Sequence, residues 1–389
     1  MRVLLFANTD WYLYNFRRTL AIALRDAGHD VILASPHGPY GEKLQALGFH
    51  WLPVPMERQS LNPWNEARLI WWLREVMQTE RVDLVHGFTI KCVVYGAIAA
   101  RLAGVPAQVS AVAGMGYVFT SQERKARWLR PIVRELLRAV LGGPNSLLIL
   151  QNPDDVELFE QAKLMPANRI RLIPGSGVDC ARFAPTFDVV NKLQNPLGVT
   201  KNLKVLLPAR LLWDKGVREY VQAAKTLISQ GRAIEFLLAG DPDLGNPASV
   251  PEQTLQQWVS SGWVHWLGHV DDMIGLLRSV DVVVLPSYRE GLPKGLIEAA
   301  ACEKALITTD VPGCREVVDH EINGLLVPAK DSQALSNAIA RFHDDSALRV
   351  RLAQAARRKA LEVFDERLII RQTLNVYYEL LPPSQLEAL

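Results

Sequence analysis

The sequence predicts an α/β protein that consists of two Rossmann-like units in series, each built on a parallel, doubly wound sheet. Short apolar runs alternate with amphipathic segments of helical length, which is the pattern of a parallel sheet covered by helices. The alternation stops at a stretch rich in Gly and Pro and then begins again. The length of 389 residues suits two domains, because a domain usually contains about 100–200 residues.

In the first unit, five apolar runs have the length and composition of buried strands. They cover residues 3–6, 31–33, 84–86, 108–111 and 147–150. Segments of helical length separate them, for example residues 16–27 and 93–102. Since a helix-length segment follows each strand, we expect neighbouring strands to run parallel.

The second unit repeats the pattern with six apolar runs, at residues 204–207, 235–238, 263–267, 282–285, 305–308 and 325–327. Amphipathic segments between and after them cover residues 217–229, 254–260, 272–278, 295–301 and 332–342. Residues 174–185 are rich in Gly and Pro and residues 186–202 are polar, which is the composition of a linker. We therefore expect one domain over residues 1–180 and another over 181–365, followed by a last helix that includes residues 369–381.

Charge and cysteine content exclude several classes of protein. With 43 Lys and Arg against 41 Asp and Glu, the formal net charge of +2 gives no reason to expect a nucleic-acid partner. Residues 1–185 carry 21 basic and 16 acidic residues, so this half would meet any anionic surface. The four cysteines lack C-x-x-C spacing, which argues against zinc and favours a reducing compartment. We find no signal peptide and no apolar run of about 18–20 residues, and expect a cytosolic protein or one on a membrane surface.

The clearest candidate site is the segment 288–299, which follows the apolar run at 282–285. Glu290 lies in a Gly/Pro loop and Glu298 about one turn into the next helix, so both can face one crevice at the carboxyl edge of the sheet. Carboxylates there can bind adjacent hydroxyls of a ribose or a hexose through charge-assisted hydrogen bonds. The alternative is that the helix dipole favours acids near this N-terminus without any ligand.

A second candidate site is the segment 208–216, which follows the apolar run at 204–207. It presents Arg210 and Lys215 just before a helix, and two cations at the carboxyl edge of a sheet suit a pyrophosphate. Each cation taken singly could simply be a solvated surface residue. Because both occupy one loop, phosphate binding is the better interpretation.

Together these segments resemble a known family. Arg210 and Lys215 in A-R-L-L-W-D-K-G, the E-x7-E element from Glu290 to Glu298, and V-P-G-C-R-E-V-V followed by N-G-L-L-V-P resemble family 4 retaining glycosyltransferases of the GT-B fold. The resemblance covers nearly the whole chain. It implies that residues 181–365 bind a UDP-sugar, that residues 1–180 bind the acceptor, and that the last helix, about 366–389, crosses back to the N-terminal domain.

The resemblance also implies roles for single residues. Arg210 and Lys215 would bind the diphosphate, Glu290 would approach the donor sugar, and Glu298 would hold the ribose. Of these, Glu290, Arg210 and Lys215 would act in catalysis. The remaining donor-binding candidates are Gly291, Leu292, Pro293 and Lys294, whose loop would contact sugar or phosphate, and Gly313 and Glu316, which would shape the uridine pocket.

In the N-terminal half, residues 8–16 and 109–119 resemble the subgroup that builds capsule, O-antigen and lipid-linked oligosaccharides. Ala113 stands where many relatives carry His, so no side-chain base is implied there. His86 could act in its place, or could equally be a structural hydrogen-bonding residue. The acceptor-side candidates are Asn8, Asp10, Tyr14, His86, Lys91, Gly114, Gly116 and Tyr117.

Two segments could face a membrane. On a helical wheel of residues 63–80, Trp64 and Trp71 lie opposite the apolar face, beside arginines. In residues 121–141 the basic side chains form one stripe, and the candidates for contact with anionic lipid are Arg127, Arg130, Arg134 and Arg138. The alternative is a pair of ordinary amphipathic helices with their apolar faces in the core.

These observations predict a retaining glycosyltransferase that moves an N-acetylhexosamine or hexose from a UDP-sugar to a polyprenyl-diphosphate-linked glycan, in bacterial surface polysaccharide assembly. We expect a peripheral protein on the inner face of the plasma membrane, with no cofactor and no metal, because no D-x-D pair lies in a site context. With no second carboxylate paired with Glu290, same-face transfer is favoured over a covalent intermediate. The alternatives are a UDP-sugar epimerase, a dinucleotide oxidoreductase, which would need a G-x-G-x-x-G that is missing here, and a non-catalytic nucleotide or lipid binder.

Overall fold

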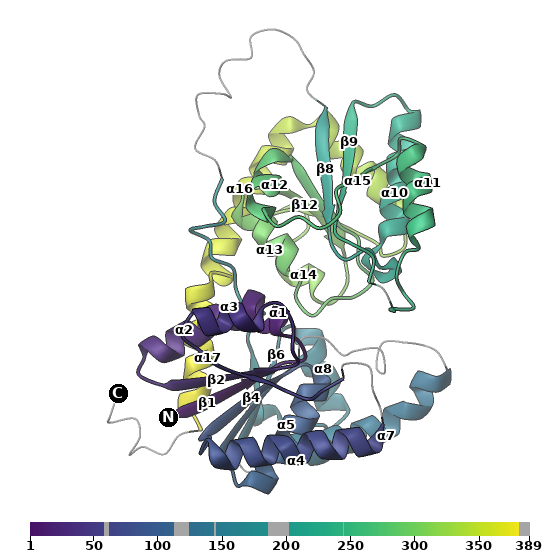
Figure 1. Cartoon of the computed structure of the whole chain (residues 1–389). Helices are drawn as coiled ribbons and strands as arrows, with labels where there is room; N and C mark the ends of the chain where they lie inside the picture. The colour runs from purple at the N-terminus through teal and green to yellow at the C-terminus, as the bar shows by residue number, and fades with distance from the viewer. Residues whose placement is uncertain (58–61, 113–123, 144, 186–201, 244, 381–389) are drawn as a thin grey trace. The chain divides into compact units, whose positions relative to one another are not determined.

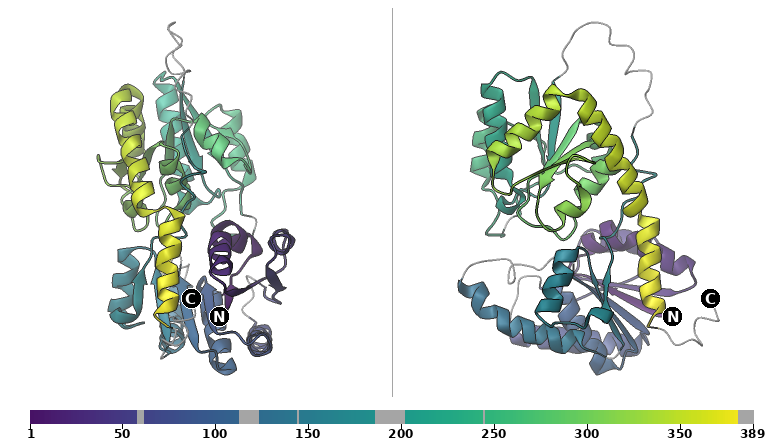
Figure 2. Two further views of the ribbon diagram at one scale, coloured as in Figure 1. Left: turned by 90° about the vertical axis from the view of Figure 1, so that its left-hand side faces the viewer. Right: turned by 180° about the vertical axis from the view of Figure 1, so that it is seen from behind.

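The computed structural model describes residues 1–57, 62–112, 124–143, 145–185, 202–243 and 245–380. It divides into two compact units. One consists of Met1–Ser176 together with the chain from Arg367 onward, and the other of Gly177–Glu366. Each unit has its own sheet with helices on both faces (Figures 1 and 2).

The N-terminal unit contains a seven-stranded parallel sheet with the order β3-β2-β1-β4-β5-β6-β7. The five predicted strands are confirmed, each extended by one to three residues, whereas the two short edge strands β3 and β7 were not predicted. The strands are β1 (Arg2–Phe6), β2 (Asp30–Ser35), β3 (His50–Pro53), β4 (Leu84–Phe88), β5 (Ala107–Val112), β6 (Ser146–Leu150) and β7 (Ile170–Leu172).

Helices connect these strands, and the first connection is irregular. The segment 16–27, predicted as one helix, begins within a π-helical turn, η1, which follows the short helix α1, and regular α-helix starts only at Arg18. Asn152 caps α8 by accepting a 2.8 Å hydrogen bond from the Asp155 amide. The helices are α1 (Asp10–Tyr12), η1 (Leu13–Arg17), α2 (Arg18–Asp26), α3 (Gly41–Ala46), α4 (Pro63–Thr79), α5 (Ile90–Ala103), α7 (Arg124–Leu141), α8 (Pro153–Gln161), η2 (Ala167–Arg169) and α17 (Glu366–Tyr378).

Alternate residues of each strand point to opposite faces, so the sheet has two separate apolar layers. Val3 and Leu5 of β1 pack with residues of α2 and α17 on one face, and Leu4 and Phe6 pack with residues of α4 and α5 on the other. Figure 1 shows α4 and α5 below the strands and the yellow helix α17 beside α2. Because both faces are covered, the strands read as continuous apolar runs.

The C-terminal unit contains a six-stranded parallel sheet with the order β10-β9-β8-β11-β12-β13. All six predicted strands are confirmed, although the run at 263–267 forms only the two-residue strand β10. The strands are β8 (Leu203–Pro208), β9 (Ile234–Ala239), β10 (His265–Trp266), β11 (Val282–Leu285), β12 (Ala305–Thr309) and β13 (Leu325–Val327).

Its helices also cover both faces. Residues of α10, α11, α15 and the first half of α16 form one core layer, and residues of α12, α13, α14 and the second half of α16 form the other. The elements are η3 (Trp213–Lys215), α10 (Val217–Ser229), α11 (Glu252–Ser260), α12 (Met273–Ser279), α13 (Lys294–Ala301), α14 (Cys314–Val317), α15 (Ser332–Asp344) and α16 (Ser346–Val363). In the part of the chain that the structure describes, no helix is both long and apolar enough to cross a membrane.

Helix α17 is fastened to the N-terminal sheet by a buried polar pair. His86 of β4 and Tyr377 of α17 are both buried, and 2.5 Å separates His86 Nδ1 from Tyr377 Oη. Burial, reinforced by the nearby Arg17 cation, holds the pKa of His86 well below its usual value, so this imidazole is neutral. The pair joins residues that are 291 positions apart, and it confirms the predicted packing of the last helix on the N-terminal unit.

Replacing Tyr377 by Phe should destabilise the N-terminal unit by about 1–3 kcal/mol, because it leaves the buried His86 Nδ1 without its partner. Urea titration, followed by circular dichroism, measures this change. The adjacent Tyr378, which is only partly buried, supplies the control, and Tyr378→Phe should change the free energy of unfolding by less than about 0.5 kcal/mol. Equal effects of the two substitutions would contradict the assigned contact.

Candidate functional site

The carboxyl edge of the C-terminal sheet brings together three loops. They follow β8, β11 and β12, and β8 and β11 are the neighbouring strands at which the strand order reverses. Ligands of open α/β sheets bind at such a switch point. The loops are joined through their backbones, since Tyr288 N donates to Asp214 O at 2.8 Å and Glu290 N to Pro312 O at 3.1 Å.

Two glycines allow these loops to approach so closely. Gly216 has φ of 73°, and a Cβ there would overlap the carbonyl of Pro286. Gly313 has φ of 83°, and a Cβ would lie 2.6 Å from the carbonyl oxygen of Glu290. Both positions therefore require glycine, for the backbone conformation and for the space.

An ion pair lies where the loops meet. Lys215 Nζ is 2.6 Å from Glu290 Oε1, and the side chains are only 19% and 13% exposed. The same oxygen accepts a 2.6 Å hydrogen bond from Ser287 Oγ, and Thr309 Oγ1 in turn donates to Ser287 O. Glu290 is therefore held in one orientation by groups from all three loops.

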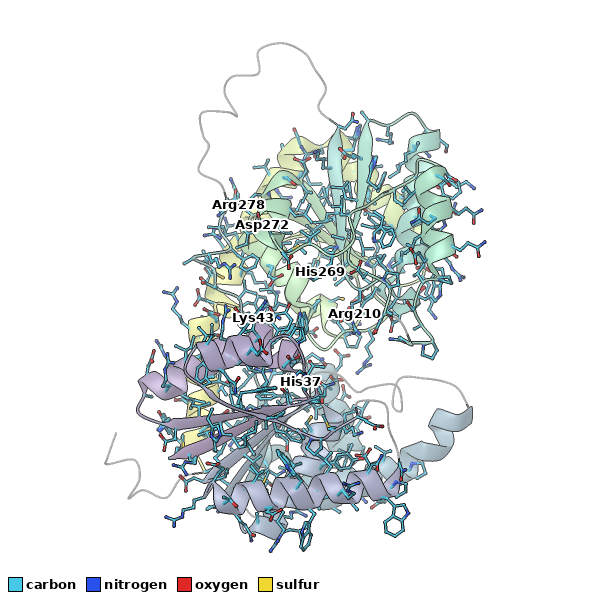
Figure 3. All side chains as sticks on the ribbon, viewed as in Figure 1. His37, Lys43, Arg210, His269, Asp272 and Arg278 are labelled. Carbon is cyan, nitrogen blue, oxygen red and sulfur yellow. The ribbon has the colours of Figure 1, made fainter. Side chains whose placement is uncertain are left out.

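Arg210 extends from the first of these loops at the end of β8 (Figure 3). Its Nη1 is 2.6 Å from Asp243 Oδ2, and its side chain is largely exposed. Asp243 is the second acid of an Asp-Pro-Asp pair for which the sequence predicts no metal, because the pair lies in a Gly/Pro loop outside a site context. In the structure Asp243 is the acid paired with Arg210. An anion that bound Arg210 would compete with Asp243.

Glu298 lies in the second turn of α13. Its carboxylate is mostly buried, and Lys294 Nζ is 4.0 Å from its Oε1. Burial raises the pKa of Glu298, and the neighbouring cations Lys294 and Arg182 oppose this shift. Gly291, Leu292 and Pro293 form the loop that enters α13.

Gly313 and Glu316 belong to the loop and short helix that follow β12. Between them, Cys314 is fully buried beside Glu290. Burial, reinforced by the Glu290 carboxylate, raises the pKa of Cys314 to about 12, so this residue is a thiol at neutral pH and not a nucleophile. Sequence reasoning missed both Ser287 and Cys314, although Cys314 stands inside V-P-G-C-R-E-V-V and Ser287 immediately precedes the segment 288–299.

The acceptor-side candidates have diverse environments. Asn8 and Asp10 follow β1, but the Asp10 carboxylate is buried and accepts hydrogen bonds from the amides of Trp11, Tyr40 and Gly41 at 2.6–3.0 Å. Its role is to hold the turn at 38–41. Tyr14 is half-buried, with its ring centroid 5.2 Å from that of Tyr40.

Two other candidates lie in contacts that stabilise the fold. Lys91 Nζ is 2.8 Å from Glu66 Oε1 and donates to Glu57 O at 2.7 Å, which ties α5 to α4. His86 lies under α17, as described above. Gly114, Gly116 and Tyr117 fall outside the residues that the structure describes.

Helix α4 has the predicted buried apolar face, with Trp64 and Trp71 exposed on the opposite side. Its apolar face is buried, including Leu69, Leu73 and Met77, whereas Trp64 is 81% exposed and Trp71 59%. The guanidinium of Arg74 lies 4.6 Å from the Trp71 ring centroid. The exposed tryptophans line a shallow surface groove together with Ala67, Arg68, Trp72 and Glu75.

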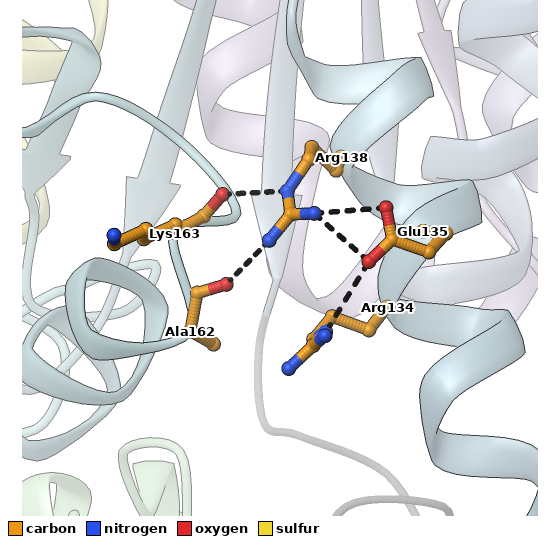
Figure 4. A network of polar contacts seen from close by, with 5 residues as sticks. All are labelled: Arg134, Glu135, Arg138, Ala162 and Lys163. Carbon is orange, nitrogen blue, oxygen red and sulfur yellow. Dashed lines mark hydrogen bonds and ion pairs between the residues drawn. The ribbon is translucent and has the colours of Figure 1, made fainter.

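The basic face of α7 is partly engaged in structural contacts (Figure 4). Arg138 donates to the carbonyl oxygens of Ala162 and Lys163 at 3.1 and 2.9 Å, just beyond the end of α8, and pairs with Glu135. Arg134 also approaches Glu135, at 3.4 Å. Arg138, predicted as a candidate for contact with anionic lipid, fastens α7 to the end of α8 while its side chain stays 41% exposed. The side chains of Arg127 and Arg130 lie outside the described residues.

Within the described ranges, no cluster of three or more His, Cys, Asp or Glu side chains is placed to hold a metal ion.

Comparison with protein families gives two matches that together span most of the chain. A model described as "Glycosyl transferase 4-like domain" matches residues 16–175, and one described as "Glycosyl transferases group 1" matches residues 202–345.

Two named relatives resemble the chain over most of its length. The N,N'-diacetylbacillosaminyl-diphospho-undecaprenol alpha-1,3-N-acetylgalactosaminyltransferase of Campylobacter jejuni is 30% identical over 380 residues, which is 97% of this chain and 98% of that one. The UDP-Gal:alpha-D-GlcNAc-diphosphoundecaprenol alpha-1,3-galactosyltransferase of Escherichia coli is 29% identical over 315 residues, or 80% of this chain and 79% of that one.

Solved structures share the fold. HepE from Anabaena in complex with UDP is 21% identical with a TM-score of 0.76, and the alignment covers 97% of this chain and 100% of that one. WaaG, a glycosyltransferase involved in lipopolysaccharide biosynthesis, is 17% identical with a TM-score of 0.72, covering 97% and 99%. These likenesses confirm the predicted fold of two Rossmann-like units.

Replacing Glu298 by Gln should raise the melting temperature at neutral pH. Burial raises the pKa of this carboxyl, so the native state holds the proton more tightly than the unfolded chain does. Below the pKa that Glu298 has in the unfolded chain, this carboxyl is protonated in both states. As the pH rises from that value through the pKa of the folded state, the stability contributed by the tighter proton binding is lost. We expect Glu298→Gln to melt about 2–4 °C above wild type near pH 7.5, with no difference near pH 4.

Thermal denaturation at the two pH values measures this difference. Glu362→Gln, at an exposed position of α16, is the matched control and should leave both melting temperatures unchanged. A gain for Glu298→Gln that was the same at both pH values would point to a cause other than ionisation.

Proposed function

The chain belongs to the glycosyl transferases of group 1, and from this premise we propose that it moves a sugar from a UDP-sugar to a glycan carried on a polyprenyl diphosphate, in bacterial surface glycan assembly. The observation that carries the proposal is the meeting of Arg210, Lys215 and Glu290 at the carboxyl edge of the C-terminal sheet. The two named relatives support the choice of acceptor, because both are named for sugars linked to undecaprenyl diphosphate. An N-acetylhexosamine or a hexose is the proposed donor sugar.

In the proposed donor site, Arg210 and Lys215 bind the diphosphate. Each cation lies beside a carboxylate. A diphosphate could replace Asp243 at the exposed Arg210 and leave the ion pair between the buried Lys215 and Glu290 in place. The loop Gly291, Leu292 and Pro293 and the first residue of α13, Lys294, contact sugar or phosphate. Glu298 holds the ribose hydroxyls, and Gly313 and Glu316 shape the pocket for the base.

The proposed reaction retains the configuration of the sugar by same-face transfer. The bond between the anomeric carbon and the diphosphate breaks, the acceptor hydroxyl adds on the same face, and its proton passes to the departing diphosphate. Lys215 and Arg210 stabilise the charge that develops on that leaving group. Glu290, oriented by Lys215 and Ser287, faces the sugar. We propose that neither a metal ion nor another cofactor takes part.

The N-terminal unit is the proposed acceptor side, with Asn8 and Tyr14 at the carboxyl edge of its sheet and Gly114, Gly116 and Tyr117 as further candidates. We propose peripheral attachment to the inner face of the plasma membrane through the exposed tryptophans of α4 and the basic residues of α7. Trp64 and Trp71 would enter the interface between headgroups and acyl chains, while Arg127, Arg130 and Arg134 would meet anionic lipid. Arg138 is left out because of its contacts with α8.

Replacing Lys215 by Ala should lower kcat by about 10²–10³, because the developing charge on the leaving diphosphate loses its buried cation. The assay measures UDP release from a panel of UDP-sugars with undecaprenyl-diphosphate N-acetylhexosamine as acceptor. Lys204, which forms a 3.7 Å ion pair with Glu235 at the other end of the same sheet, supplies the control, and Lys204→Ala should leave kcat unchanged.

Several outcomes of this assay would count against the proposal. Consumption of the UDP-sugar without any acceptor would favour an epimerase. Activity that EDTA abolishes and magnesium restores would reject the proposed absence of a metal. A glycosyl adduct trapped on Glu290 would reject same-face transfer.

Replacing both Trp64 and Trp71 by Ser should weaken binding to liposomes that contain anionic lipid by about tenfold or more, since two large exposed side chains lose their place in the interface. Liposome flotation measures the bound fraction at several lipid concentrations. Ile322, 65% exposed in the C-terminal unit, provides the control substitution Ile322→Ser. Binding that ignored the anionic lipid content would reject the electrostatic part of the proposal.

A further inference from the structure

Tyr288 and Glu219 form a polar contact beside the candidate donor site, and the proposed function does not use it. Tyr288 belongs to the loop after β11, whereas Glu219 lies in the first turn of α10 and is only 8% exposed. The phenol oxygen of Tyr288 lies 2.9 and 3.0 Å from the two carboxylate oxygens of Glu219 and donates a hydrogen bond to that carboxylate. A hydrogen bond to an ionised acceptor is stronger than one between neutral groups.

The ring of Tyr288 is held as well as its hydroxyl. Lys330, in the turn after β13, places its Nζ 4.9 Å from the ring centroid, which is the geometry of a cation–π contact. Burial, reinforced by the hydrogen bond to Glu219, raises the pKa of Tyr288. The phenol therefore keeps its proton at physiological pH and remains a hydrogen-bond donor to Glu219.

This contact joins the same two segments of the chain that carry the ion pair of the candidate site. The turn η3, directly before α10, supplies Lys215, and the loop after β11 supplies Glu290. A 2.8 Å backbone hydrogen bond from Tyr288 N to Asp214 O also connects the two segments. They are therefore linked by one backbone contact and by two side-chain contacts, which are the ion pair and the hydrogen bond to Glu219.

The two side-chain contacts differ in how a bound donor affects them. In the proposed donor site a diphosphate shares the Lys215 ammonium with Glu290, which weakens the attraction between those two side chains. The hydrogen bond between Tyr288 and Glu219 includes no residue assigned to the donor, so a bound diphosphate leaves it intact. It can therefore hold the two segments together while the charge of Lys215 is shared with the ligand.

We infer that Tyr288 and Glu219 are positioning residues of the donor site, whose hydrogen bond keeps Lys215 in place beside Glu290 for binding a diphosphate. The inference rests on the proposed function, because it takes the ligand of Lys215 to be the diphosphate of a UDP-sugar. Both residues act through Lys215. A displacement of about 1 Å in a group that stabilises the transition state can lower a rate by about 10²-fold, so a contact outside the site can affect the reaction.

The test measures Kd for UDP by isothermal titration calorimetry and kcat by UDP release, both on the full chain and well below its melting temperature. Tyr288→Phe keeps the ring and its contact with Lys330 and removes only the hydroxyl. We expect Kd to rise about three- to tenfold and kcat to fall about tenfold, because Lys215 is held less precisely. Wild-type values of both Kd and kcat in Tyr288→Phe, or a wild-type chain that binds no UDP, would overturn the inference.

Substitutions of Glu219 test whether the hydrogen bond itself is responsible. Glu219→Gln keeps an oxygen that accepts the Tyr288 hydroxyl, so Kd and kcat should stay within about twofold of wild type, whereas Glu219→Leu should match Tyr288→Phe. Because both side chains act through one hydrogen bond, the double variant should lose no more than either single variant. Losses that multiply in the double variant would contradict the shared role. If Glu219→Leu does not fold, the comparison of Tyr288→Phe with Glu219→Gln still decides.

Tyr220→Phe is the matched control for a loss of stability alone. Tyr220 follows Glu219 in α10 and is fully buried, and its hydroxyl oxygen lies 2.8 and 3.0 Å from the carbonyl oxygens of Val205 and Leu237. Its substitution should lower the melting temperature and leave Kd for UDP and kcat unchanged. A rise in Kd as large as that of Tyr288→Phe would mean that stability is the cause and would overturn the inference.

The two readouts separate this inference from the proposed function. A wild-type chain that binds UDP but transfers no sugar would refute the proposed function, and the comparison of Kd values would still test the positioning role. Transfer by the wild-type chain together with unchanged Kd and kcat in Tyr288→Phe would refute the positioning role and leave the proposed function in place.

Discussion

The ion pair between Lys215 and Glu290 joins loops that follow two neighbouring strands of the C-terminal sheet, 75 residues apart in sequence. It can form because parallel strands all end at one edge and because Gly216 and Gly313 let the loop backbones touch. Ser287 Oγ then donates a hydrogen bond to the Glu290 carboxylate, and Thr309 Oγ1 donates to the carbonyl oxygen of Ser287. The proposed chemistry depends on this arrangement, since a cation poised for a diphosphate and an acid poised for a sugar must keep one fixed separation.

The two units solve the problem of buried charge differently. In the C-terminal unit each cation of the candidate site has an acid beside it, Glu290 for Lys215 and Asp243 for Arg210. In the N-terminal unit Arg17 rests on an aromatic ring with no acid among the described residues. The switch point of a parallel sheet therefore holds a cation beside an acid in one unit and a cation on an aromatic ring in the other.

In the N-terminal unit, some side chains of the outer helices stabilise the fold and others are exposed to solvent. In α4, Leu69 and Leu73 are buried in the core while Trp64 and Trp71 point outward, although all four are large apolar residues. In α7, Arg138 is held by the end of α8. Exposed tryptophans are costly in water unless another surface covers them, which is why α4 rather than Arg138 is the stronger part of the proposed membrane contact.

The sequence by itself determined the two parallel sheets, eleven of their thirteen strands, and the residues of the donor-side motifs. These follow from local periodicity and from the rule that loops at the carboxyl ends of parallel strands meet. It did not determine the edge strands β3 and β7, whose sequences H-W-L-P and I-R-L form no continuous apolar run, or the π-helical turn before α2. Only the tertiary structure decided that Asp10, Lys91 and His86 make structural contacts and that Arg17 is buried with no acid beside it among the described residues. Those facts depend on partners up to 291 residues away, and no local pattern of residues encodes them.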